Sequence, residues 1–141
     1  MTPEAERLVA EGELEAAARL LGRPFEVEGV VVEGDRRGKL LGFPTANLEL
    51  PAGQVLPPKG IYAGAALGHR AAISIGVNPH YGGTVLRVEA HLLDFDGDLY
   101  GRPLAVELWQ RLRDERAFAS EQELVDAIAA DVEATRRAVR P

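Results

Sequence analysis

The chain has 141 residues, of which 46% are hydrophobic and 27% charged, and its formal net charge is −6 at pH 7. This length and composition suit one globular domain with one core, and the absence of cysteine excludes disulfides, cysteine-ligated zinc and thiol nucleophiles. The acidic charge disfavours a nucleic-acid-binding surface, while the lack of a long apolar run or a signal-peptide pattern argues against a membrane protein and favours the cytoplasm.

Residues 1–24 are predicted to form a helical arm. Thr2 suits the N-cap of a first helix and Pro3 its first turn, and a Glu-Gly-Glu interruption separates this helix from a second one that stops at Gly22. We therefore divide the chain into a linker-like arm and a main domain over residues 25–141.

Six short strands are predicted in the main domain, because alternating or continuous apolar runs are separated there by Gly, Pro and Asp-Gly turn signals. These strands cover residues 25–32, 45–49, 60–67, 71–77, 85–95 and 103–109. With no helix between them, the strands favour an antiparallel barrel or sandwich over a βαβ sheet. Closing the sheet would also remove its exposed edges.

A C-terminal helix is predicted to begin after Ser120, which forms a capping-box pattern with Glu123. Leu124, Ile128 and Val132 repeat every four residues along one face of this helix. We expect the helix to pack on the barrel rather than to carry chemistry.

The most informative segment covers residues 38–47, where two glycines, Lys39 and Pro44 precede Thr45 and Asn47. Glycine lets a backbone approach a ligand closely, and in an extended chain the side chains of Thr45 and Asn47 project from one face. Neutral oxygens beside a lysine suit a phosphate with a hard cation such as Mg²⁺. A glycine-rich turn that leads into an ordinary strand explains the same residues equally well.

Glu89 lies within the predicted strand 85–95, on the same face as Arg87 and His91. The opposite face of this strand is apolar. Glu89 is therefore either part of a solvated cross-strand charge group or a general base held on a strand, ready to take a proton from a hydroxyl group.

Three alternating aspartates, Asp94, Asp96 and Asp98, resemble a cation-binding loop. They do not fit the EF-hand pattern, because the glycine comes one residue early and no closing glutamate follows. An acidic hairpin turn is the preferred interpretation. Tyr100, just beyond it, offers either a stacking surface or a cap on the core.

Several segments together resemble the riboflavin kinase family, which comprises the kinase half of bacterial FAD synthetases and its free-standing relatives. They occur in the family's order over about residues 25–138, and the phrase Gly-Phe-Pro-Thr-Ala-Asn at residues 42–47 is highly specific. The matching segments are residues 34–48, 56–62, 74–79, 89–95 with 98–101, and 112–113 with Phe118.

The resemblance implies a six-stranded antiparallel Greek-key barrel with a C-terminal helix. It also implies ATP- and Mg²⁺-dependent phosphorylation of the terminal ribityl hydroxyl of riboflavin, which gives FMN and ADP. By motif position, Thr45 and Asn47 would hold Mg²⁺ and the ATP phosphates, and Glu89 would be the base on the riboflavin hydroxyl. Further ligand contacts implied in this way are Gly34, Gly38, Lys39, Gly42 and Pro44 around the nucleotide, Tyr100 at its border, and Arg113 in a mobile flap over the flavin.

In two-domain FAD synthetases a nucleotidyltransferase domain with a histidine-containing motif precedes this kinase. Here about 24 residues without histidine precede the barrel, so we expect no FAD synthesis from this chain. A stand-alone kinase and a fragment of a bifunctional enzyme both fit, and the oligomeric state stays open. A non-catalytic flavin-binding module and a purely structural docking barrel are the alternatives to a small-molecule kinase.

Overall fold

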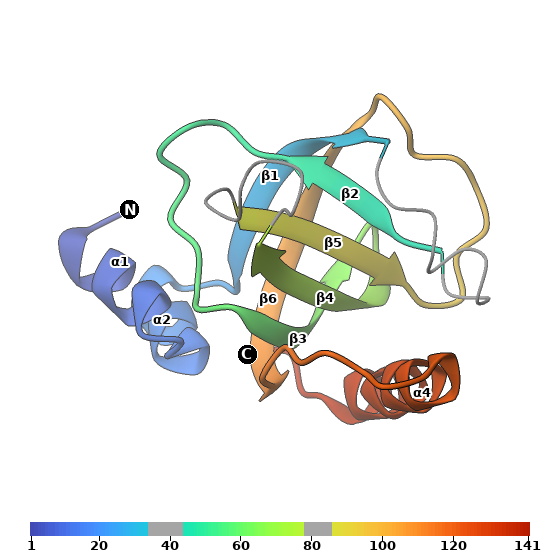
Figure 1. Cartoon of the computed structure of the whole chain (residues 1–141). Helices are drawn as coiled ribbons and strands as arrows, with labels where there is room; N and C mark the ends of the chain where they lie inside the picture. Colours follow the sequence, from blue (N-terminus) through green and yellow to red (C-terminus); the bar gives the residue numbers. More distant parts are fainter. Residues whose placement is uncertain (34–43, 78–85) are drawn as a thin grey trace.

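A computed structural model of the chain describes residues 1–33, 44–77 and 86–141. Its centre is a closed antiparallel barrel with the strand order β1-β2-β5-β4-β3-β6 (Figure 1). The strands are β1 (Phe25–Val32), β2 (Ala46–Glu49), β3 (Gly60–Ala66), β4 (His69–Val77), β5 (Leu86–Leu92) and β6 (Pro103–Arg113). Because β6 returns to lie beside β3, the neighbours β6-β3-β4-β5 form a Greek key. The predicted barrel is thus confirmed, and the sandwich is excluded.

Three helices surround the barrel within the described residues. The helices α1 (Pro3–Ala10) and α2 (Leu14–Leu21) lie at one side, and α4 (Glu121–Arg137) lies at the other (Figure 1). As predicted, Thr2 caps α1 by accepting a hydrogen bond from the Ala5 amide at 3.2 Å, and Ser120 caps α4 in the same way. Gly22 ends α2 in the left-handed conformation with φ of 77°. No helix in these described ranges is long and apolar enough to cross a membrane.

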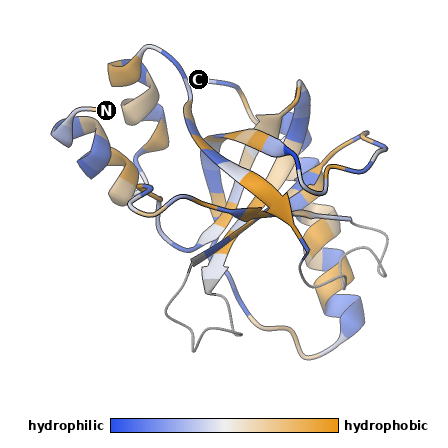
Figure 2. Ribbon diagram, turned by 90° about the horizontal axis from the view of Figure 1, so that it is seen from above, coloured by the Kyte–Doolittle hydropathy of each residue, from blue (hydrophilic) through white to orange (hydrophobic). Residues whose placement is uncertain are grey.

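The barrel interior is filled by apolar side chains from alternate positions of the strands. Hydrophobic and hydrophilic residues alternate along the ribbon in Figure 2, as expected for strands with one buried face. Side chains buried almost completely include Val27, Tyr62, Ile73, Ile75, Val88, Val106 and Leu108. Each such side chain contributes about 1.5–3 kcal/mol through its removal from water.

The N-terminal arm packs onto the barrel. Val9, Leu14 and Ala17 are at most 2% exposed and belong to the same hydrophobic cluster as Phe25 at the start of β1. The division into residues 1–24 and 25–141 stays a prediction, but these contacts attach the arm to the barrel core.

Replacing Leu14 with alanine is expected to lower the free energy of unfolding by about 2–4 kcal/mol, because it leaves a cavity between the arm and the barrel. Leu20, in the same helix but 48% exposed, is the matched control, and Leu20→Ala should cost less than about 0.5 kcal/mol. Urea unfolding followed by circular dichroism measures both. Equal small losses for the two variants would mean that the arm unfolds separately from the barrel.

Two strand ends differ from the predicted ones by more than two residues. The strand β5 ends at Leu92 rather than at residue 95, because the chain leaves the extended conformation at Asp94, which adopts the left-handed region with φ of 57°. The strand β6 continues to Arg113, pairing with β3 through two register shifts. A shift of this kind changes which face a side chain occupies, and a period-two pattern does not foresee it.

The helix α4 is fixed to the barrel at its C-terminal end. Arg70 from β4 donates to the carbonyl oxygens of Thr135 and Ala138 at 3.0 and 2.6 Å. Arg136 forms an ion pair of 2.9 Å with Asp94 and lowers the pKa of that carboxyl. These contacts hold the helix across the outside of β4 and β3, where it borders a cavity.

Candidate functional site

A row of side chains crosses the outer face of the barrel. Asn47 in β2 lies opposite Glu89 in β5, and Glu89 lies opposite Ser74 in β4. Residues paired in this way point to the same face of a sheet. Since the flanking Val88 and Ala90 are fully buried inside the barrel, the row points outward.

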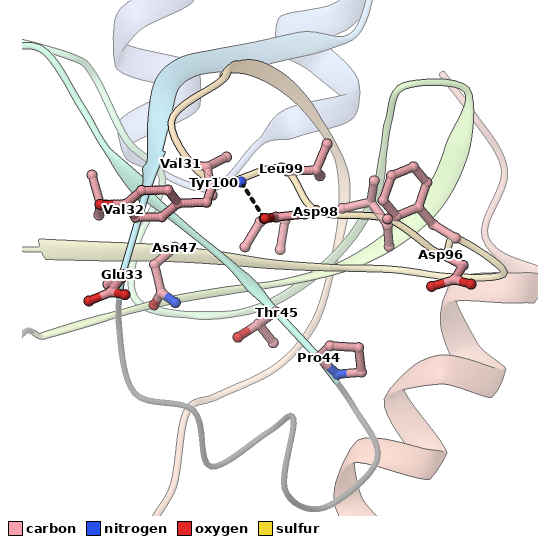
Figure 3. A pocket seen from close by; sticks show the side chains of 15 residues that line it. Val31, Val32, Glu33, Pro44, Thr45, Asn47, Asp96, Asp98, Leu99 and Tyr100 are labelled. Atoms are coloured by element: carbon pink, nitrogen blue, oxygen red, sulfur yellow. Dashed lines mark hydrogen bonds between the residues drawn. The ribbon is translucent and has the colours of Figure 1, made fainter.

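The first cavity has a volume of about 600 Å³ and lies at the β1–β2 side of this row. Thr45 and Asn47 project into it from the same side of the chain, as predicted, and Glu33 from the end of β1 lies beside Asn47 (Figure 3). Pro44 and Tyr100 also line it. The cavity therefore presents neutral oxygens together with carboxylates.

The second cavity has a volume of about 430 Å³ and lies between the outer wall of the barrel and the helix α4. Its polar lining includes Ser74, Glu89 and His91 from the strands, and Leu124 and Ile128 supply an apolar wall from α4. This volume falls in the range of small-molecule sites. The C-terminal helix thus packs on the barrel, as expected, and it also lines this cavity.

The two cavities meet at Thr45, which lines both. Asn47 faces the first cavity and its cross-strand partner Glu89 faces the second. If one molecule bound in each cavity, the two molecules would therefore come closest to each other near Thr45. Such an arrangement allows a group to pass from one bound molecule to the other.

Glu89 is held by its neighbour Arg87. The Nε of Arg87 lies 3.0 Å from Oε1 of Glu89, and the Glu89 side chain is 17% exposed. Arg87 and Glu89 thus form a charge pair within β5, whereas the structural interpretation from the sequence was a solvated cross-strand group. The same carboxylate lines the second cavity. The ion pair with Arg87 is therefore compatible with a role of Glu89 as a general base.

His91 fixes the start of β2. Its Nδ1 lies 2.8 Å from the carbonyl oxygen of Pro44, to which it donates when that nitrogen carries the proton. This contact joins residues 47 positions apart in the sequence. It holds the backbone directly before Thr45, the residue that the two cavities share.

Arg113 is the last residue of β6 rather than a member of a flap, in contrast to the expectation. Its guanidinium donates two hydrogen bonds of 2.8 Å each to the carboxylate of Asp131 in α4. Asp131 is 7% exposed, so the pair is largely buried. The arrangement connects the end of the barrel to the helix and makes Arg113 part of the second cavity.

The acidic segment after β5 contains turns but is not the predicted hairpin, because β5 and β6 are not neighbours in the barrel. The backbone amide of Tyr100 donates to Oδ1 of Asp98 at 2.9 Å, and both residues line the first cavity, where the Tyr100 side chain is 61% exposed. Across the described part of the chain, no three His, Cys, Asp or Glu side chains cluster as a metal-ligand set. The expected ligand contacts Gly34, Gly38, Lys39 and Gly42 lie outside the described residues.

Sequence reasoning missed the residues that close the second cavity from outside the barrel. Asp131 and Glu115 come from α4 and from the segment before it, and both line this cavity. Asp131 follows Ile128 by three residues and so lies on the same side of α4 as the apolar row, where the apolar spacing alone does not predict a buried carboxylate. The Arg-Asp-Glu run at residues 113–115 was a possible signal, because charged residues at a strand end often pair across an interface.

The riboflavin kinase family model matches residues 21–139. The chain belongs to the riboflavin kinase family. This match includes the barrel, both described cavities and the whole of α4.

Known proteins agree with the family. The bifunctional riboflavin kinase/FMN adenylyltransferase of Escherichia coli strain K12 is 44% identical over 128 residues, covering 87% of this chain and 41% of that protein. Riboflavin kinase from Trypanosoma brucei superposes with a TM-score of 0.60 at 30% identity, covering 81% of this chain and 78% of that one. The riboflavin kinase domain described here thus spans less than half the length of the bifunctional relative.

A third similar structure carries a different description. The Streptococcus pneumoniae structure described as a macrolide-efflux protein superposes with a TM-score of 0.90 at 34% identity, covering 99% of this chain and 47% of that one. Its fold therefore agrees with the kinase domain over nearly every residue. The efflux function in this description is stated for the Streptococcus protein and is not transferred to the present chain.

Proposed function

We propose that this riboflavin kinase domain binds ATP in the first cavity and riboflavin in the second, and that it transfers the γ-phosphate to the terminal ribityl hydroxyl. The observation that supports this proposal is the meeting of the two cavities at Thr45, with Asn47 on one side and Glu89 on the other. The products are FMN and ADP. The cytoplasm, which supplies ATP, is the expected compartment.

In this proposal the first cavity holds the nucleotide as its magnesium complex. The Thr45 hydroxyl and the Asn47 carboxamide are neutral oxygen donors of the kind that Mg²⁺ accepts alongside substrate phosphates. The described lining also contains the carboxylates Glu33, Asp96 and Asp98 but no lysine or arginine. A nucleotide entering this part of the cavity would therefore need a cation to offset its own charge.

When bound, Mg²⁺ would neutralise charge on the β- and γ-phosphates. The protein's own contribution is to orient the acceptor. Glu89 takes the proton from the ribityl hydroxyl, whose oxygen then forms a bond to the γ-phosphorus as the bond from that phosphorus to the bridging oxygen of ADP breaks. The proton leaves on the carboxylate, and the phosphoryl group stays on riboflavin.

The second cavity suits the flavin end of the acceptor. Leu124, Ile128 and Phe118 offer apolar surface for a flat ring system, while Ser74 and Glu89 offer polar groups at the barrel wall. The hydroxylated chain of riboflavin would then point toward Thr45. A ligand with an apolar ring and a polar tail matches this division of the lining.

The test is incubation of the purified chain with riboflavin, ATP and Mg²⁺, followed by chromatography and mass spectrometry for FMN and FAD. FMN and ADP in equal amounts, without FAD, are the expected products. Flavin binding without turnover would favour a non-catalytic flavin-binding module, and neither binding nor turnover would favour a structural barrel.

A further inference from the structure

Glu115 lies directly against the backbone of Gly76 in β4. A Cβ placed on Gly76 would stand 2.4 and 2.6 Å from the two carboxylate oxygens of Glu115, closer than real contacts allow. The φ angle of Gly76 lies outside the left-handed region, so the local backbone does not require glycine. The missing side chain at this position therefore makes room for the carboxylate of Glu115.

Arg87 stands between two carboxylates. It is the cross-strand partner of Gly76, and its Nη2 lies 4.0 Å from Oε1 of Glu115, while its Nε lies 3.0 Å from Oε1 of Glu89. Among the described residues this buried Nε has no aligned hydrogen bond. The guanidinium thus attracts the two carboxylates by charge, and it joins Glu115 to the residue proposed as the base.

Glu115 belongs to the segment that follows β6, residues 114–118, which we call the closing segment. Its last residue, Phe118, lines the second cavity beneath the guanidinium groups of Arg113 and Arg116, 5.7 and 4.8 Å from its ring centre. One end of the segment is fixed by the Arg113–Asp131 pair. Glu115 connects the middle of the closing segment to the barrel through its contacts with Gly76 and Arg87.

We propose that Glu115 is a positioning residue that uses Gly76 and Arg87 to hold the closing segment against the second cavity. Arg87 has a double role, because it also holds Glu89 toward the acceptor. The inference rests on the proposed function, in which riboflavin occupies this cavity. In this proposal Gly76 leaves room for the side chain of Glu115, which comes from a distant part of the sequence.

The first test is Glu115→Gln, which keeps the shape of the side chain and removes its charge. The KM for riboflavin should rise about fivefold, the scale expected when a partly exposed ion pair is lost, while kcat and the KM for Mg·ATP stay within about twofold. Gly76→Ala should give the same result by displacing the carboxylate. This variant should keep its fold, because the displaced group is the free end of a flexible side chain.

Two further variants separate positioning from a general loss of structure. The double variant G76A/E115Q should be no worse than either single variant, since both remove one contact. Arg87→Gln should lower kcat as well as raise the riboflavin KM, because Glu89 loses its partner. Glu11→Gln is the matched control: Glu11 is 53% exposed, pairs with Arg7 at 3.2 Å in the N-terminal arm, lines neither cavity, and its neutralisation should leave both constants unchanged.

Steady-state kinetics, riboflavin binding by flavin fluorescence and thermal unfolding of every variant measure these effects. Wild-type chain that forms no FMN would contradict the proposed function itself. Active wild-type chain with an unchanged riboflavin KM in both Glu115→Gln and Gly76→Ala would contradict the positioning role alone. Additive losses in the double variant would also contradict it, because the two residues would then act separately.

Discussion

Replacing Glu89 with glutamine is expected to lower kcat for FMN formation by about 10²- to 10⁴-fold, the usual contribution of a general base. Glutamine keeps the size of the side chain and its place opposite Asn47, but it cannot take the proton of the ribityl hydroxyl. The KM for riboflavin and the fluorescence-detected binding of riboflavin should change little. Initial rates at saturating riboflavin and Mg·ATP measure the loss.

Glu49→Gln is the matched control for this prediction. Glu49 lies on the neighbouring strand β2, is exposed and lines neither cavity, so its neutralisation should leave kcat unchanged. If Glu89 served only as the charge partner of Arg87, Glu89→Gln would lower the melting temperature and spare turnover. A kcat within about threefold of the wild-type value would therefore rule out the assignment as base.

The barrel could be predicted because its signals are local. Each strand has an apolar face with period two, and Gly, Pro and Asp-Gly turns separate the strands, so the six strands were located to within a few residues of their observed ends. The exceptions have local causes as well. Asp94 adopts the left-handed conformation and ends β5 early, whereas the register shifts against β3 let β6 continue past Trp109 to Arg113.

The orientation of the side chains in the inner part of the candidate site could also be predicted from the sequence. Thr45 and Asn47 project from one side of the chain, as strand alternation requires, and Glu89 shares its outward face with Arg87 and His91. The pairing of Asn47 with Glu89 was not foreseen, since it depends on the register between β2 and β5. Alternation gives the face of a side chain but not its partner in another strand.

The outer wall of the second cavity depends on contacts between distant segments, and periodicity carries no information about them. The pair Arg113–Asp131 joins residues 18 positions apart, and Glu115 reaches Gly76 from another strand end. A helix pattern indicates which residues are apolar, yet Asp131 is buried on α4 because a particular arginine meets it. Such polar pairs become visible only when the elements are placed in space.

Asn47→Ala is expected to raise the KM for Mg·ATP by about 10- to 100-fold, because an interaction with a charged group is worth about 1.5–3 kcal/mol. The Mg²⁺ concentration needed for half-maximal rate should rise as well. Riboflavin binding should stay unchanged, since Asn47 lines the first cavity and not the second. Titrations of ATP and of Mg²⁺, each at saturating riboflavin, measure these shifts.

Thr45→Val extends this prediction, because valine keeps the shape of threonine and removes its oxygen. Thr45 lines both cavities, so this variant should weaken the use of Mg·ATP. A concurrent rise in the riboflavin KM should distinguish it from Asn47→Ala. Gln110→Ala, which removes an exposed carboxamide from β6 away from both cavities, is the control. An unchanged dependence on ATP and Mg²⁺ in Asn47→Ala and Thr45→Val would show that the metal and the phosphates are held elsewhere, with the residues 34–43 as the next segment to change.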